Sequence, residues 1–255
     1  MSSTNKKVPL SLENESISEE HGNLIRSRPL LNKFYIEVYE FFLKELASIP
    51  VGRVLEIGSG GGFFQDYFPN LIQSDIAPVA NITLVCNAEK LPFLDNSISA
   101  VVMMNVLHHI PDCAEFFNHA NRVLKPGGKI IMLEPATTIF SKIIYKSLHH
   151  EPFDEYSPKW KFKSKSSYDR MMDANGALPW AIFIRDRKKF ESLYPKLQIR
   201  KVTSDSPFLY LLSGGLSFPQ LAPTFSMPLI SAVETLLSPL NRYLALFYRI
   251  VLEKN

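Results

Sequence analysis

The stretch "VLEIGSGGGFF", from Val54 to Phe64, decides how the rest of the chain is interpreted. A short apolar run that contains Glu56 is followed by five residues, of which four are glycine. A run of this kind, bounded by glycine, is typical of a buried parallel strand. Glycines at the carboxyl end of such a strand let a ligand approach the main chain closely. The stretch therefore predicts a strand that ends at a ligand site.

Working outward, apolar runs and one helical segment alternate along the chain. The segment from Cys113 to Leu124 has helical spacing and ends before Pro126, Gly127 and Gly128. Further strand-like runs are predicted at residues 71–74, 82–86, 99–104 and 129–133. This alternation predicts an α/β fold with a mostly parallel sheet. Only six residues separate Asp75 from Ile82, too few for a helical crossover, so the second crossover is expected to be reduced.

The glycines do not fit a dinucleotide site. The pattern G-x-G-x-x-G, started at Gly58, requires glycine at position 63, which is Phe63. Started at Gly60, it fails at Gln65. The stretch satisfies E-x-G-x-G-x-G instead, through Glu56, Gly58, Gly60 and Gly62.

This pattern resembles motif I of class I S-adenosylmethionine (SAM)-dependent methyltransferases. Four further segments resemble that family in its order and near its spacing, and together they cover about 85 residues. They are Asp75 after the second strand, "CNAEKLPFLDNSIS" (86–99), "NVLHHIPD" (105–112) and "NRVLKPGGKIIMLEP" (121–135). The resemblance implies a Rossmann-like class I methyltransferase sheet, mostly parallel with an antiparallel last strand, and SAM as the cofactor.

The resemblance also implies the cofactor-binding residues. Glu56 and the main chain of Gly58, Ser59, Gly60 and Gly62 would hold the methionine moiety of SAM. Asp75 would accept hydrogen bonds from both ribose hydroxyls, as a carboxylate can. Asn87 and Ala88 would contact the adenine, and Asn105 and Val106 would close the other side. Two departures are Asn87, where the family usually has aspartate, and Ile98-Ser99 in place of Phe-Asp.

The sequence does not identify a catalytic base. Methyl transfer needs alignment and desolvation, and needs a base only when the acceptor is protonated. The candidates are His108 and His109 after the fourth strand, Glu134 at the end of the fifth strand, where it is expected to face the pocket, and His149 and His150 in "HHEPFD". The alternative for the first pair is that one histidine caps the helix near Pro111 while the other packs. No metal site is expected, because adjacent histidines point to different faces of a helix.

The flanks are divided into three parts around a SAM-binding core at residues 51–135. Residues 1–50 are expected to be an arm, disordered or loosely docked to about residue 22, followed by an amphipathic helix from Leu30 to Leu46. Residues 136–213 are expected to form a substrate-side insertion and the end of the sheet. In it, a helix covers 137–150, a strand covers 180–184, Asp186 starts a helix, and 197–202 pairs with 207–213 as an antiparallel hairpin.

Residues 214–255 are predicted to be an apolar helical extension. Its stripe is kinked or split at Pro239 and comprises Leu229, Val233, Leu236, Leu237, Leu240, Leu244, Phe247 and Val251. The stripe is interpreted as core or dimer contact, or as a lid or interfacial membrane helix. The uncharged segment before it, broken by prolines, favours an apolar or lipid-linked acceptor and excludes a continuous membrane-spanning helix.

The net charge, the cysteines and the N-terminal residues limit the kinds of partner and cellular location to be expected. A net charge of +3 gives no reason to expect nucleic acid, and the two cysteines form no disulfide pattern. The polar first residues lack the apolar core of a signal peptide, so a cytoplasmic protein is expected, with peripheral membrane contact as the alternative. A small-molecule acceptor is expected, and no oligomeric state is indicated. A non-catalytic SAM-binding or interaction protein and a NAD-dependent oxidoreductase are the competing functions.

Overall fold

The computed structural model describes residues 10–80, 82–148, 151–163 and 173–255. Its centre is a seven-stranded sheet in the order β3-β2-β1-β4-β5-β7-β6. The predicted fold class is confirmed: β7 runs antiparallel to both of its neighbours, and the pairs among β1 to β5 are parallel. The strands are β1 (Arg53–Ile57), β2 (Leu71–Asp75), β3 (Leu84–Val85), β4 (Ile98–Met104), β5 (Leu124–Pro135), β6 (Leu197–Asp205) and β7 (Phe247–Lys254).

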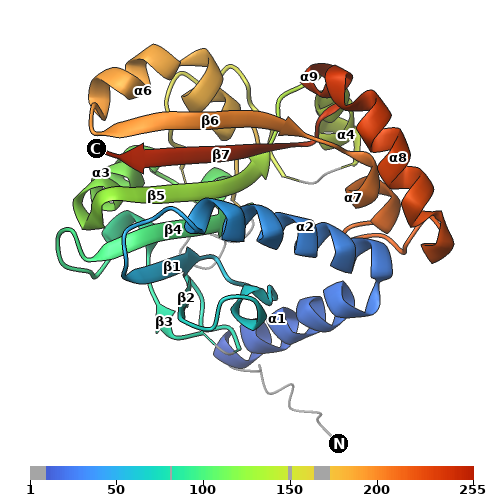
Figure 1. The fold of residues 1–255 in the computed structure, drawn as a ribbon, viewed down its shortest axis with the longest axis horizontal. Helices are drawn as coiled ribbons and strands as arrows, with labels where there is room; N and C mark the ends of the chain where they lie inside the picture. The colour runs from blue at the N-terminus through green and yellow to red at the C-terminus, as the bar shows by residue number, and fades with distance from the viewer. Residues whose placement is uncertain (1–9, 81, 149–150, 164–172) are drawn as a thin grey trace, which may run out of the picture.

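Helices cover both faces of this sheet (Figure 1). Side chains of β1, β4 and β5 alternate between the faces, so that Leu55 and Val54 belong to different core clusters. One face packs against α3 (Cys113–Val123) and α6 (Arg187–Leu193) through Phe117 and Phe190. The other packs against α2 (Pro29–Leu46) and α7 (Phe208–Ser213). The sheet is thus buried on both sides, as continuous apolar strands require.

The reduced second crossover is confirmed. Between β2 and β3 the described residues of 76–83 contain no helix, and β3 has only two residues. Its main chain joins β2 through Cys86, whose N–H donates to the carbonyl of Asp75 at 2.9 Å. Asp75 therefore ends its strand with only this two-residue strand beside it.

The N-terminal flank is more ordered than predicted. The helix at Leu30–Leu46 is confirmed as α2, but residues 10–22 form no loose arm, because α1 spans Leu10–Ser27. Its low apolar content hid it from the sequence pattern. Ser18 and Ile25 are nevertheless buried, because α1 packs over the glycine loop and α2.

The C-terminal prediction is wrong in two places. Residues 208–213 form α7 rather than half of a hairpin, and β6 pairs with β7 instead. Phe247 and Val251 belong to β7, so the predicted helical stripe ends earlier. The other residues of the predicted apolar stripe lie on α8 (Met227–Leu237), on the turn Ser238–Leu240 and on α9 (Asn241–Leu244). A period-2 and a period-3.6 pattern cannot be separated in a run as apolar as 244–252.

Two helices complete the substrate-side segment. The helix predicted at 137–150 is α4 (Ile139–Leu148), and the strand predicted at 180–184 is wrong. Residues 178–185 are helical, as α5 (Leu178–Trp180) followed by a wider π turn (Ala181–Arg185). Asp186 precedes α6 as predicted, but its carboxylate accepts from Trp160 Nε1 rather than capping the helix.

In the part of the chain that is described, none of the helices combines the length and the apolar character needed to cross a bilayer.

Candidate active site

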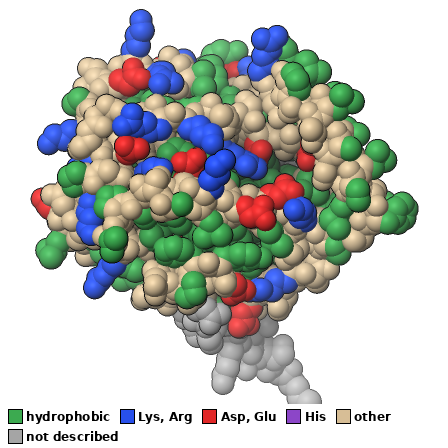
Figure 2. Space-filling view, viewed as in Figure 1, with side chains coloured by type: hydrophobic (Ala, Val, Ile, Leu, Met, Phe, Trp, Pro, Cys, Tyr) green, Lys and Arg blue, Asp and Glu red, His purple; other side chains and the backbone are tan. Residues whose placement is uncertain are grey.

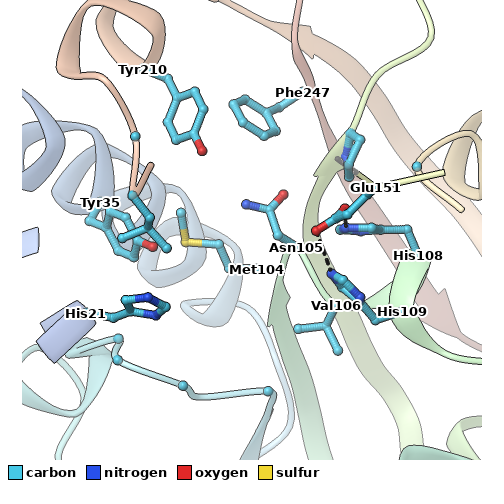
Figure 3. A pocket seen from close by; sticks show the side chains of 18 of the residues that line it. His21, Tyr35, Met104, Asn105, Val106, His108, His109, Glu151, Tyr210 and Phe247 are labelled. Atoms are coloured by element: carbon cyan, nitrogen blue, oxygen red, sulfur yellow. Dashed lines mark ion pairs between the residues drawn. The ribbon is translucent and has the colours of Figure 1, made fainter. Parts of the chain in front are cut away.

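A cavity of about 500 Å³ opens where β1, β2 and β4 end (Figure 3). One side, here called the glycine half, is lined by the loop after β1 and by the ends of β2 and β4. The other side, the aromatic half, is lined by α2, α4, α7 and the start of β7. The glycine half comprises Glu56, Gly58–Gly62, Asp75, Asn87, Ala88, Asn105 and Val106; the aromatic half includes Tyr35, Tyr145, Phe153, Tyr210, Phe218 and Phe247.

The glycine loop needs glycine at two positions for different reasons. Gly58 has a φ of +71°, and a Cβ there would lie 2.4 Å from Val106 Cγ2. Gly60 has a φ of +47°, and no atom lies within 4 Å of the Cβ position. The first glycine lets β1 and β4 end close together, and the second leaves open space at the cavity wall.

Glu56 lies at the base of this loop and is buried. Ser59 Oγ donates to its Oε2 at 3.0 Å. Burial raises the pKa of Glu56 to about 7, although the hydrogen bonds from Ser59 and Gln73 act in the opposite direction. The site thus holds a carboxyl group that gains from a nearby cation.

Asp75 shapes the loop as well as the cavity. Its Oδ2 accepts from the N–H of Gly60 at 3.1 Å, and its Oδ1 accepts from the N–H of Ala77 at 3.1 Å. Burial raises the pKa of Asp75, against the lowering effect of these main-chain donors. The carboxylate is therefore fixed in position at the cavity edge.

Asn87 and Asn105 use their side chains differently. Asn87 Oδ1 caps the short turn after β3 by accepting from Glu89 N at 2.9 Å. Asn105 has a φ of +56°, a conformation that asparagine tolerates better than most residues. Its side chain extends into the cavity (Figure 3), and its buried Oδ1 has no hydrogen-bond partner among the described residues. Asn105 thus offers an unused acceptor to a ligand.

Helices α1 and α2 contribute residues that sequence reasoning missed. Ser18 Oγ donates to the carbonyl of Gly60 at 2.7 Å, and the N–H of Phe63 donates to Tyr39 Oη at 2.9 Å. Gly22 and Gly61 pack so closely that a Cβ on Gly61 would lie 2.7 Å from Gly22 N. The available signal was the pair of small residues Ser18 and Gly22, one helical turn apart, which allows close helix packing.

Glu134 does not face the cavity. Its side chain is fully buried at the end of β5, and Oε1 accepts from Val106 N at 2.9 Å and Leu107 N at 2.7 Å. Its Oε2 lies 2.7 Å from His108 Nδ1. Burial alone would lower the pKa of His108, but the carboxylates of Glu134 and Glu151 raise it to about 9. Glu134 therefore positions the turn after β4.

His108 and His109 both line the cavity, and neither caps α3, whose first N–H groups are accepted by Asp112. His108 Nε2 lies 3.4 Å from Glu151 Oε2, and His109 Nε2 lies 3.5 Å from Glu151 Oε1. Burial and the neighbouring His108 lower the pKa of His109 to about 4. Glu151 was quoted as part of "HHEPFD" but was not singled out. His149 and His150 lie outside the described residues.

The aromatic half is assembled from distant parts of the chain. Tyr210 of α7 contacts Phe247 of β7 edge-to-face, with 4.9 Å between ring centroids, and it contacts Phe34 of α2 at 4.9 Å. Arg28, at the junction of α1 and α2, donates to the carbonyls of Gly215 and Phe218. These contacts connect the N-terminal helices to residues 210–218 and to β7 at the cavity.

Comparison with known proteins agrees with this geometry. Residues 55–132 match the family model described as a methyltransferase domain. The ubiquinone/menaquinone biosynthesis C-methyltransferase UbiE of Pseudomonas savastanoi pv. phaseolicola is 28% identical over 180 residues, which cover 60% of this chain and 68% of that protein.

Two solved structures share the fold. The geranyl diphosphate C-methyltransferase of Streptomyces coelicolor A3(2), in complex with Mg²⁺, geranyl diphosphate and S-adenosyl-L-homocysteine, is 14% identical with a TM-score of 0.52, covering 97% of this chain and 90% of that one. A putative methyltransferase of Haloferax volcanii, in complex with the Trm112 activator, is 15% identical with a TM-score of 0.51, covering 96% and 97%.

The sheet order, the five motifs in sequence order and the matched domain agree: the chain has the class I methyltransferase fold, and residues 55–132 form a methyltransferase domain within it.

Proposed function

We propose that SAM binds in the glycine half of the cavity and that an apolar small-molecule acceptor binds in the aromatic half. One observation carries this proposal: both halves belong to a single continuous cavity. A methyl group can pass from donor to acceptor only when the two are held in contact and in line, with water excluded. One cavity with a polar and an apolar side meets that requirement.

The residues of the glycine half fit SAM. Gly60 leaves open space where a Cβ would stand, and Asn105 Oδ1 is a buried acceptor with no partner among the described residues. Glu56 would bind the ammonium of the methionine moiety, and Asp75 would accept from the ribose hydroxyls. The main chain beside Ala88 and Val106 would flank the adenine. When bound, SAM supplies a methyl group on a sulfonium, from which the neutral thioether is a good leaving group.

The aromatic half favours an acceptor with a large apolar part. Tyr210, Phe247 and Tyr35 give it aromatic walls, and Leu216, Phe218 and Leu221 extend it toward the surface. Burying an apolar ligand here gains about 25 cal/mol for each Å² removed from water. The relative named for ubiquinone/menaquinone biosynthesis supports this class of acceptor. The walls would also keep water from the methyl group.

Calorimetry tests the cofactor. SAM and S-adenosylhomocysteine should bind and NAD should not, because Phe63 occupies the position of the third dinucleotide glycine. Asp75→Ala should weaken SAM binding about 100-fold, since it removes charged hydrogen bonds worth about 1.5–3 kcal/mol each. Asp95→Ala is the matched control, because Asp95 is exposed and pairs with Arg122. Equal affinity in both variants would contradict the proposed SAM site.

Turnover tests the acceptor. Quinols and prenylated phenols should be methylated faster than sugars or amino acids of similar size. Binding of SAM without turnover on any acceptor would instead favour the non-catalytic alternative weighed from the sequence.

We further propose that the acceptor reaches the cavity from a lipid surface. Beyond Leu221, apolar side chains continue through the turn before α8 and along α8, with Phe225, Leu229 and Leu236 exposed by 86%, 68% and 78%. Hydrophobic atoms gather on the edge of the molecule where α8 lies (Figure 2). An exposed apolar patch of this kind is typical of an interaction site.

Vesicle flotation tests this route. The wild-type protein should float with neutral phosphatidylcholine vesicles, and a Leu229→Gln/Leu236→Gln variant should remain in solution. Leu94→Gln is the control, because Leu94 is 81% exposed in the loop before β4. Flotation that is absent, or equal in all three proteins, would refute the lipid route.

A further inference from the structure

Three nitrogen and oxygen donors converge at the border between the two halves of the cavity. His108 and His109 lie on one short turn (Leu107–His109), with ring centroids 4.2 Å apart. Both rings face Glu151, which comes from the segment after α4 (Figure 3). One donor atom from each residue lies within 4.8 Å of the others. Adjacent histidines diverge on an α-helix, but on this turn they share a direction.

The other nitrogen of each ring is already held. His108 Nδ1 lies 2.7 Å from Glu134 Oε2, and His109 Nδ1 donates to the carbonyl of Asp173 at 3.2 Å. A carbonyl can only accept, so the proton of a neutral His109 is on Nδ1, and its Nε2 presents a lone pair. A carboxylate or carbonyl behind the imidazole is the usual support of a metal-binding histidine. The turn is therefore arranged to present both Nε2 atoms toward Glu151.

The distances between donors suit a shared ion. The pairs from Nε2 to the Glu151 oxygens, at 3.4 and 3.5 Å, are longer than the usual 2.7–3.2 Å of an N–H···O bond. Ligands about 2.0–2.1 Å from a tetrahedral zinc ion are separated by about 3.4 Å. Both contacts are thus longer than direct hydrogen bonds, and from donor atoms within 4.8 Å of one another only small side-chain movements are needed to place all three around one ion.

The charges around the two histidines also favour a bound cation. Glu134 is fully buried and Glu151 is mostly buried, so two carboxylates lie beside two imidazoles in a region of low exposure. Buried charges are stable only when they are paired or bound to a metal. A divalent cation bound at both Nε2 atoms would displace a proton from His108 and would take over the neutralisation of the carboxylates that His108 faces.

We propose that His108, His109 and Glu151 bind a divalent transition metal, of which Zn²⁺ best matches two imidazoles and one carboxylate. All three residues line the cavity, so an oxygen-bearing acceptor bound there, such as a phenol, would be within reach of the ion. This role in acceptor binding rests on the proposed function, whereas the metal site itself is measurable without turnover.

Metal titration of the full chain tests the site. The protein is first stripped with a chelator and dialysed. One sample is then titrated with Co²⁺, whose visible absorption is intense in tetrahedral sites. A second sample is loaded with Zn²⁺, and the bound Zn²⁺ is measured by elemental mass spectrometry. The wild type should bind one equivalent. Glu151→Gln and His109→Gln should each lower the affinity at least tenfold, and circular dichroism verifies their folding.

His119→Gln is the matched control, because His119 lies on α3 and contacts Arg122. It should bind like the wild type. Equally weak Co²⁺ binding in the wild type and in all three variants would overturn the metal site, and so would the absence of tetrahedral Co²⁺ absorption in the wild type. Calorimetry with SAM on the same stripped samples separates the two proposals: SAM binding without metal binding removes only this inference, and metal binding without SAM binding removes only the proposed function.

Discussion

The two halves of the cavity are built by opposite means. The glycine half comes from one stretch of the chain, residues 56–106, and four of its lining residues are glycines, which expose main chain to the cavity. The aromatic half brings together side chains from α2, α4, α7 and β7, which lie up to about 200 residues apart. A site made of main chain tolerates few changes of shape, whereas a site made of side chains can be altered one residue at a time. The predictions below test this difference.

Gly58→Ala should have the largest effect. A left-handed φ and a clash at 2.4 Å with Val106 together should lower the free energy of unfolding by about 3 kcal/mol. SAM binding should be lost with the shape of the loop. Urea denaturation and calorimetry measure the two effects.

Gly127→Ala provides the comparison for this variant. Gly127 also has a positive φ, but its Cβ would meet only Pro50, at 3.4 and 3.7 Å, and Gly127 does not line the cavity. It should lose about 1 kcal/mol of stability and keep the affinity for SAM. If Gly127→Ala reduced SAM binding as much as Gly58→Ala, backbone strain alone would explain both.

The pH dependence of SAM binding should be next in size. Below the pKa of about 7, the Glu56 carboxyl is protonated in the free protein, and an ammonium ligand requires it ionised. The dissociation constant should therefore rise about tenfold for each pH unit below 7 and stay constant above pH 8. Glu56→Gln should bind SAM more weakly and remove this contribution to the slope. An identical slope in that variant would assign the titration to another group.

Leu221→Ala should have the smallest effect, and only on the acceptor. Leu221 lines the cavity near the surface and is 65% exposed, so its truncation removes part of one apolar contact. The KM for an apolar acceptor should rise about three- to fivefold, equivalent to nearly 1 kcal/mol, with the SAM affinity unchanged. Leu94→Ala should change neither constant. A Leu221→Ala protein with weaker SAM binding would show that the halves are not separable.

The same contrast explains what the sequence could predict. The residues 54–62, Asp75 and the PGG turn carry their conformational demands locally, so the parallel core and the position of the glycine loop followed from pattern. The sequence pattern missed helix α1 because its apolar content is low, and it missed β7 because the strand and helix periods cannot be separated in an apolar run. The meeting of Glu151 with His108 and His109 depends on tertiary folding over 40 residues, which no local pattern encodes.

The position of β7 has a consequence for biosynthesis. Residues 247–254 occupy the space between β5 and β6, and Lys254 Nζ is held by the carbonyls of Asn121 and Leu124. The ribosome must therefore pass residue 254 before the sheet can close. Until then β5 and β6 present unpaired edges, which other chains can bind. Phe247 lines the cavity only once β7 has joined the sheet. The growing chain therefore completes its glycine loop long before it has a pocket for the acceptor.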